Sequence, residues 1–249
     1  MSVPSEYVLH VKQQLTKVST PEKAQSSKRY FPQGINCIGA NAADIKHIIK
    51  QFHIEHANLT PEQVLCITED TIQHSEFSEE IMVAYGLINK FVKKHYDDNL
   101  LQRFEYWLKN YANNWALVDD LCMKALFNFL MARPHLIEKT QAWARSDVSW
   151  CRRASNVAWV KFIRRPIGHS IYYLDIKLVF NNCDLLIGDP DEFVQKSIGW
   201  LLKVTAIHHQ NEVLNYIKLN HQNMQRSTIR YALEKVDRNS RQTLLQECK

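Results

Sequence analysis

The sequence predicts an all-α protein, and three observations support this fold class. Apolar residues recur at i, i+3 and i+4 spacing along most of the 249 residues, which is the periodicity of amphipathic helices. Only 6 glycines and 7 prolines are present, too few for the many turns of a large β fold. The gaps between helical segments are mostly about 2–6 residues, so successive helices are expected to pack as antiparallel hairpins.

The helical pattern gives a set of expected elements. Taken in chain order, these segments are 5–18, 41–54, 61–73, 77–94, 98–112, 114–132, 134–145, 148–163, 170–182, 190–206, 209–220 and 223–237. Two stretches break the pattern. Residues 19–40 are turn-rich and are expected to form a long loop after the first helix. Residues 164–190 are longer than a simple helix connection requires and are expected to lengthen the array there.

Several of these helices begin with recognisable capping residues. Thr60 is placed as an N-cap with Pro61 at the first helical position, and Asn113 or Asn114 is expected to cap segment 114–132. Acidic residues in 189–192 are expected to begin the helix that contains Trp200, as the helix dipole favours. Segment 77–94 has two possible first residues, Ser75 and Ser78.

Successive helix pairs recur at roughly 35–45 residues, which is typical of HEAT-like repeats. The prediction is one domain, 1–249, forming a HEAT-like superhelix (an α-solenoid) with a concave binding face. Residues 1–40 would supply an N-terminal helix and loop, and 164–190 the longer inter-helix segment. A compact helical bundle is the structural alternative.

Charge and cysteine content narrow the functional class. The net charge is +5, but residues 139–165 hold seven basic residues and one acid, a local excess of +6. This stretch is either a solvated helix face or a stripe that binds phosphates. The six cysteines lack CxxC spacing and are expected to be buried free thiols. With no signal peptide and no run of about 18 apolar residues, a cytoplasmic location is expected.

Four residues carry the chemistry that the sequence suggests. Trp115 and Asp119 are four apart, so a helix places the indole and the carboxylate on one face. Arg153 and Trp200 lie in later amphipathic helices that could converge on the same surface. One acid, one guanidinium and two indoles suit a cationic planar group attached to phosphate, which fits an alkylated purine in DNA.

The chain resembles the AlkD-type alkylpurine DNA glycosylases of the DNA alkylation repair family. The resemblance begins at Tyr30-Phe31-Pro32, continues through Trp115–Asp119 and Trp150–Arg153, and reaches the QKSIGW string at 195–200. It therefore covers most of the chain. QKSIGW and the W-x-x-x-D pair are its specific parts, whereas the Tyr-Phe-Pro segment is weak.

The resemblance implies hydrolysis of the N-glycosidic bond of cationic purines, N3-alkyladenine or N7-alkylguanine, in duplex DNA. Asp119 is the catalytic candidate, because a carboxylate stabilises the sugar as it gains positive charge and orients water. Trp115 and Trp200 would attract the charged base through their π faces. Arg153, with Arg152 and Lys161 from the basic stretch, would bind the DNA backbone. The resemblance implies that the protein acts without a metal and holds the lesion against its surface, and no cofactor is expected. A monomer is expected because the sequence has no exposed heptad and no obvious apolar seam.

Each assignment has a plainer alternative. A tryptophan in an amphipathic helix is usually a packing residue, and Trp107, Trp143 and Trp159 are placed in that class. Trp150, one turn before Arg153, is expected to buttress it. His53 and His56 are not followed by further ligands at metal-site spacing, so no metal site is expected.

Two other functions compete with the glycosylase. One is a non-catalytic protein that binds damaged or branched DNA, against which the acid at 119 argues, since a pure DNA binder has no need of a carboxylate beside phosphates. The other is a HEAT-like scaffold for protein interactions.

Overall fold

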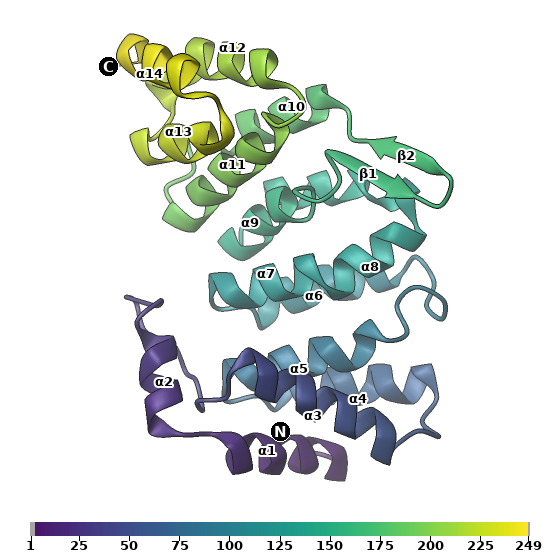
Figure 1. Cartoon of the computed structure of the whole chain (residues 1–249). Coiled ribbons are helices and arrows are strands. Elements are labelled where there is room, and N and C mark those ends of the chain that lie inside the picture. Colours follow the sequence, from purple (N-terminus) through teal and green to yellow (C-terminus); the bar gives the residue numbers. More distant parts are fainter. Residues whose placement is uncertain (1–2, 249) are drawn as a thin grey trace. The chain divides into compact units, whose positions relative to one another are not determined.

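The computed structural model describes residues 3–248, which pack as two compact units divided between residues 132 and 133 (Figure 1). The all-α prediction is confirmed, with one short hairpin added. The division into two units leaves the single domain as a prediction. None of the described helices is long and apolar enough to cross a membrane.

The first unit consists of eight helices among the described residues. They are α1 (Glu6–Val18), α2 (Pro21–Lys28), α3 (Ala42–Glu55), α4 (Pro61–Gln73), α5 (Ser78–Asn89), α6 (Leu100–Asn110), α7 (Trp115–Met123) and α8 (Ala125–Ala132). Helix α5 is central, since it contacts α1, α3, α4, α7 and α8. Its apolar neighbours form a core that includes Val11, Leu15, Ile48, Phe52, Val64, Val83 and Leu87. Burial of these side chains is what holds the helix pairs together.

Local chemistry sets where these helices start. The Thr60 hydroxyl accepts the amide hydrogen of Gln63, whose side chain in turn accepts that of Thr60, and Pro61 follows as predicted. Asn114, rather than Asn113, caps α7. Helix α5 begins at Ser78 with Phe77 in the N-cap position, so Ser75 is excluded as its start.

Two predictions in the first unit are wrong. The expected loop 19–40 contains α2, a polar helix capped by Thr20, none of whose residues is buried. Apolar periodicity cannot detect such a helix. The expected single helix 114–132 is divided at Lys124, whose backbone (φ −121°, ψ −85°) leaves the helical region. Residues around this break are apolar on every side, so the sequence pattern continues across it.

The second unit is also helical. Its elements are the 3₁₀ helices η1 (Pro134–Leu136) and η2 (Glu138–Arg145), α9 (Ser149–Val157), β1 (Arg164–Ile167), β2 (Ser170–Tyr173), α10 (Ile176–Leu186), α11 (Glu192–Thr205), α12 (Gln210–Asn220), η3 (His221–Asn223), α13 (Arg226–Ala232), η4 (Leu233–Lys235) and α14 (Arg238–Glu247). Helix α11 packs against α9, α10 and α13 and is the centre of this unit. Asp191 caps it, as predicted for the acidic start.

The second unit corrects three further predictions. Segment 134–145 is 3₁₀ rather than α-helical, and 223–237 is α13 flanked by 3₁₀ turns. The expected helix 170–182 is only partly present, because 170–173 form β2, antiparallel to β1. Gly168, with φ +59°, allows the two-residue turn between the strands. Helix α14, polar except for a few residues, was not predicted.

The cysteine and tryptophan predictions are largely confirmed. Trp107, Trp143 and Trp159 are buried, and the Trp159 indole donates to the Ile137 carbonyl at 2.9 Å. All six cysteines are free thiols; those at 122, 151, 183 and 248 are buried. Cys66 is exposed and Cys37 half-buried, which corrects the expectation for these two positions.

Candidate functional site

The first candidate residue, Trp115, is held at the start of α7. The Asn114 side chain accepts the amide hydrogens of Ala116 and Leu117, at 3.0 and 3.1 Å, and so fixes the first turn of the helix. Phe31, which follows α2, stacks on the half-buried Trp115 indole with ring centroids 5.1 Å apart and planes 15° apart. One face of the indole is thereby covered by the protein.

Asp119 lies one helical turn beyond Trp115, as its spacing requires, and is half-buried. Its neighbour Asp120 has different surroundings. The Asp120 side chain is only 11% exposed and forms an ion pair with Lys124. Burial raises the pKa of its carboxyl above the ordinary value, an effect that the Lys124 ammonium opposes and the Asp119 charge reinforces.

A cavity of about 920 Å³ opens beside Trp115 within the first unit. Its apolar wall comes from the segment after α2 and from α3, α5 and α7, and includes Phe31, Ile45, Ile49, Met82 and Trp115. Two acids line it. Glu79 accepts backbone amide hydrogens from Ile38, Gly39 and Ala40.

The other acid in the cavity is less well satisfied. Asp120 Oδ2 is buried and has no hydrogen-bond partner among the described residues. A cavity with aromatic walls and one such carboxylate suits a planar group with a partial positive charge. The sequence contains only a weak indication that Asp120 belongs to such a site. This indication is the spacing of four residues between Asp120 and Lys124.

In the second unit, Arg153 is a buried residue of α9. It is 5% exposed, and its Nη1 donates to the Phe193 carbonyl oxygen at 2.7 Å, joining α9 to the first turn of α11. The Trp150 ring lies 5.6 Å from the Phe193 ring. Trp150 therefore supports Arg153 indirectly, through Phe193. The contact with Phe193 fixes the orientation of the guanidinium group.

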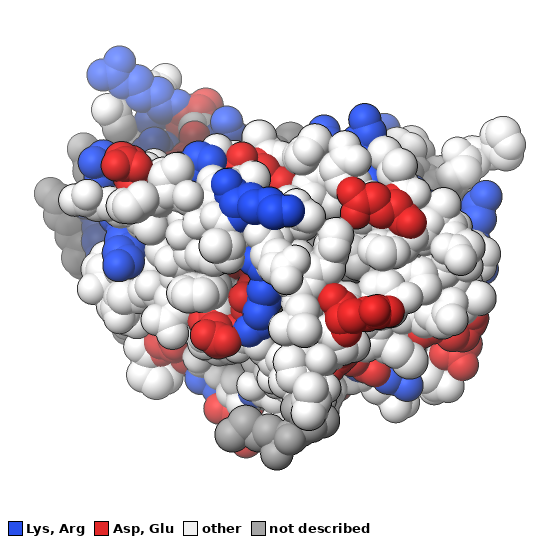
Figure 2. All heavy atoms as spheres, turned by 90° about the horizontal axis from the view of Figure 1, so that it is seen from below, with Lys and Arg blue, Asp and Glu red and all other residues white. Residues whose placement is uncertain are grey.

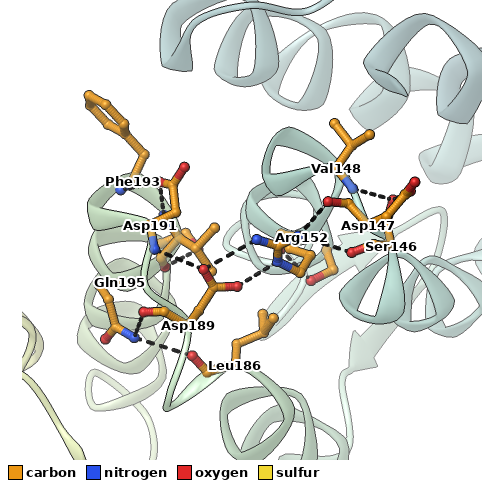
Figure 3. A network of polar contacts seen from close by, with 12 residues as sticks. Ser146, Asp147, Val148, Arg152, Leu186, Asp189, Asp191, Phe193 and Gln195 are labelled. Atoms are coloured by element: carbon orange, nitrogen blue, oxygen red, sulfur yellow. Dashed lines mark hydrogen bonds and ion pairs between the residues drawn. The ribbon is translucent and has the colours of Figure 1, made fainter. Parts of the chain in front are cut away.

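Arg152 is held in a polar network that connects α9 to the turn before α11 (Figure 3). Its Nε and Nη2 donate to the two carboxylate oxygens of Asp189, at 2.5 and 3.3 Å, and its Nη1 donates to the carbonyls of Ser146 and Asp147. The Asp189 side chain is 5% exposed, and such a two-pronged contact is strong and directional. The structure thus gives Arg152 a role in holding this turn together, and its contact with DNA stays a prediction.

The QKSIGW string has a clear structural basis in α11. Gln195 Nε2 donates to carbonyls at 187 and 189, both at 2.9 Å, which closes the turn seen in Figure 3. Ser197 Oγ accepts a hydrogen bond from Asn156 at 2.9 Å. A Cβ at Gly199 would lie 3.0 Å from the Thr228 carbonyl oxygen, so glycine permits the close approach of α11 and α13. Trp200 follows and is half-buried.

The basic stretch 139–165 is only partly a solvated face. Besides Arg152 and Arg153, Arg165 is drawn inward, with its Nε donating to the Lys161 carbonyl at 2.7 Å. Burial, and then the nearby Arg165 guanidinium, lower the pKa of the Lys161 ammonium. Two positive side chains held this close favour an anion between them.

The candidate residues fall into two groups. Trp115 and Asp119 share one helix face in the first unit, as predicted, while Arg153, Arg152, Lys161 and Trp200 belong to the second unit. The meeting of the two groups on one surface stays a prediction.

Comparison with known proteins decides the family. The family described as DNA alkylation repair enzyme matches residues 11–236, nearly the whole chain. The chain belongs to the DNA alkylation repair enzyme family. No curated protein matches it closely enough in sequence to be named as a relative.

Solved structures of DNA alkylation repair proteins share the fold. A protein described as a predicted DNA alkylation repair enzyme from Enterococcus faecalis is 17% identical, with a TM-score of 0.74 over 88% of this chain and 97% of that one. AlkD2 from Streptococcus mutans is 15% identical, with a TM-score of 0.55 over 86% and 99% of the two chains. The alkylpurine DNA glycosylase AlkC from Pseudomonas fluorescens, bound to DNA with an abasic site analogue, is 16% identical, with a TM-score of 0.52 over 96% and 66%.

The match to the DNA alkylation repair family contains every candidate residue, since all of them lie between 115 and 200. The surface charge is less distinctive. Figure 2 shows basic and acidic side chains interspersed over the face that carries α1, without a continuous positive patch on that face. On that face, charge alone gives no indication of a phosphate-binding site.

Proposed function

We propose that this protein is a DNA glycosylase that hydrolyses the N-glycosidic bond of cationic alkylated purines in duplex DNA. The substrates would be N3-alkyladenine and N7-alkylguanine, and the products a free base and an abasic site. The observation that carries the proposal is the Trp115–Asp119 pair on one face of a capped helix, in a chain of the DNA alkylation repair family. The chain would act as a monomer and without a cofactor.

The carboxylate of Asp119 would act on the sugar. Alkylation at N3 or N7 makes the purine a good leaving group, so little protonation of the base is needed. The sugar, however, gains positive charge as the bond breaks. A negative charge fixed close to the anomeric carbon stabilises that state and orients the attacking water. Placement of Asp119 on a capped helix favours this role, because a charge held rigidly needs no reorganisation during the reaction.

The indoles would select the charged base. A cation over a tryptophan face gains roughly 0.5–2 kcal/mol, whereas a neutral purine gains only stacking. Phe31 covers one face of Trp115, which restrains the ring and limits how the base approaches it. Trp200 would act in the same way from the second unit. This preference explains how an enzyme with little leaving-group catalysis would discriminate against normal bases.

Arg153 and Lys161 would hold the DNA backbone. The hydrogen bond from Arg153 to the Phe193 carbonyl fixes its guanidinium plane, which a directed contact with a phosphate requires. A phosphate beside Lys161 and Arg165 would raise the lowered pKa of Lys161 again and so favour its charged form. Such contacts set register on the duplex and carry no sequence preference.

A matched pair of variants tests the proposal. Release of 7-methylguanine from a duplex oligonucleotide would be measured under single-turnover conditions for wild type, Asp119→Asn and Asp120→Asn. The Asp119→Asn rate should fall by about 100-fold or more, the usual loss when one electrostatic group in a reaction site is removed. Asp120→Asn makes the same chemical change one residue away and should lose much less.

The other outcomes are equally informative. An Asp119→Asn protein as fast as wild type would refute the catalytic assignment. A collapse confined to Asp120→Asn would move the chemistry to the acid in the cavity. If wild type binds the duplex but releases no base, the protein is a DNA binder rather than a glycosylase.

A further inference from the structure

Three side chains of the first unit meet away from the candidate functional site. His10 lies in α1, Glu55 is the last residue of α3, and His56 follows it directly. Each offers one nitrogen or oxygen atom, and these three atoms lie within 4.8 Å of one another. His10 Nε2 is 3.3 Å from Glu55 Oε2. None of the three lines the cavity beside Trp115.

One separation among these atoms fits the coordination shell of a small divalent ion. Zn²⁺ binds nitrogen and carboxylate oxygen at about 2.0–2.2 Å in tetrahedral geometry, which places neighbouring ligand atoms about 3.3 Å apart. That is the separation of His10 and Glu55. The His10 and His56 rings have centroids 5.6 Å apart and planes at 82°. Two imidazoles on one tetrahedral ion would have centroids about 5 Å apart, so small rotations of the rings suffice.

A second observation also indicates a missing partner. The Nε2 atom of His56 is buried and has no hydrogen-bond partner among the described residues. Buried polar atoms without a partner are uncommon in folded proteins, and a bound ion can satisfy such a nitrogen. The His56 ring is held in place by Phe52, at 4.6 Å between centroids, and by the edge of Tyr7, at 5.2 Å.

The position of Glu55 also favours a bound cation at this place. A carboxylate at the C-terminal end of a helix faces the negative end of the helix dipole, which is unfavourable unless a cation lies nearby. We propose that His10, Glu55 and His56 bind one Zn²⁺ ion, with water in the fourth position. The ion would join α1 to the end of α3, and it is independent of the proposed glycosylase reaction.

The spacing along the chain hides this site. The sequence suggested only the pair His53 and His56, which is three apart and lacks a further ligand nearby. The structure brings in His10, forty-six residues before His56, because α1 packs against α3. His53 does not belong to the group.

Calorimetric titration with zinc sulfate tests the site on the full chain, after removal of metal with EDTA and exchange into chelator-free buffer. Wild type should bind one equivalent at this site, and His10→Ala and Glu55→Gln should each weaken that binding at least about tenfold. His47→Ala is the matched control, because His47 is exposed on the same helix α3. Cys66→Ser controls for the exposed thiol. Both controls should bind as wild type does.

Thermal unfolding gives an independent readout. Zn²⁺ in excess should raise the melting temperature of wild type and both controls, because the ion binds only the folded chain. It should raise the melting temperatures of His10→Ala and Glu55→Gln clearly less, because both bind the ion more weakly, while circular dichroism confirms that both are folded. Binding of equal strength in all five proteins would overturn the proposal, as would a wild type that binds no Zn²⁺. Loss of binding in Cys66→Ser alone would assign the metal to the thiol and also refute it.

Discussion

Asp119 and Asp120 are consecutive residues of α7 with different surroundings. Asp120 is almost buried at the cavity wall, with its charge opposed by burial and only partly compensated by Lys124. Asp119 is half-buried on the face that it shares with Trp115. The helix face that Asp119 shares with Trp115 favours Asp119 over Asp120 for the proposed reaction, because the indole is where the charged base would bind.

Burial of Asp120 has a consequence for stability. Its pKa is raised in the folded protein, so the folded state holds the proton more tightly than the unfolded chain does. The protonated Asp120 carboxyl therefore favours the folded state at acid pH. This contribution to the free energy of unfolding is lost as pH rises through the folded-state pKa. Asp120→Asn should be more stable than wild type at pH 7, with the gain vanishing as pH falls below about 4, the ordinary range of an aspartate.

Urea unfolding of the two proteins from pH 3 to pH 8 measures this difference. If Asp120→Asn is less stable than wild type at pH 7, the ion pair with Lys124 stabilises the protein more than burial of the charge destabilises it. The predicted direction of the stability difference would then be wrong. Lys124→Met removes the partner and should destabilise the protein at neutral pH.

The residue scale also shows what spacing can and cannot predict. Trp115 and Asp119 share a face because four residues make about one helical turn. Helical periodicity alone was therefore enough to predict their placement. The covering of Trp115 by Phe31 and the burial of Asp120 depend on α2 and on packing between distant segments. Arg153 lies in a basic run that could equally have been a solvated face, whereas its guanidinium bonds to a carbonyl forty residues along the chain. No local pattern contains that information.

At the scale of elements, helices with a strong apolar stripe and a capping residue were predicted well. Thr60, Asn114 and Asp191 cap helices as expected, because capping depends on local hydrogen bonds. The missed elements are the polar helix α2, the hairpin of β1 and β2, and α14. The polar helices bury few side chains, and the hairpin is too short and exposed for alternation to stand out.

The contact between α11 and α13 gives a prediction at this scale. Gly199→Ala adds a Cβ that would lie 3.0 Å from the Thr228 carbonyl and 3.0 Å from Tyr231 Cδ1. The two helices must then move apart, and the expected loss of stability is about 1–3 kcal/mol. Gly188→Ala is the control, since a Cβ there meets no atom within 4 Å.

Urea unfolding again provides the measurement. Gly199→Ala should unfold at a clearly lower urea concentration than wild type. Gly188→Ala should unfold at nearly the same urea concentration as wild type. Equal midpoints for the two variants would show that α11 and α13 tolerate a methyl group, and that the glycine of QKSIGW is not there for packing.

At the scale of the whole molecule, the family assignment connects the two units. Nearly the full chain matches one family, and solved structures of DNA alkylation repair proteins share its fold at 15–17% identity. At such low identity, the shared feature is the helical framework and not particular side-chain contacts. The all-α fold class could therefore be predicted from periodicity, while the arrangement of candidate residues from two units on one surface stays a prediction.

Binding to duplex DNA should depend steeply on salt, because each phosphate contact releases counterions. The logarithm of the binding constant is expected to fall with the logarithm of salt concentration by about 0.9 per phosphate neutralised. Lys161→Ala should reduce that slope by about 1. Lys218→Ala, an exposed lysine paired with Glu247, should leave the slope unchanged. Fluorescence anisotropy at several salt concentrations measures both, and a Lys161→Ala slope equal to wild type would remove Lys161 from the interface.

The central claim is that the protein releases purines because they are positively charged. It is tested most directly by incubating the wild-type chain in excess with two duplexes, one containing 7-methylguanine and one containing the neutral O6-methylguanine. Free base and abasic sites are then quantified. The proposed function predicts rapid release of 7-methylguanine above its spontaneous loss and none of O6-methylguanine. Release of neither base from duplexes that the protein demonstrably binds would contradict it.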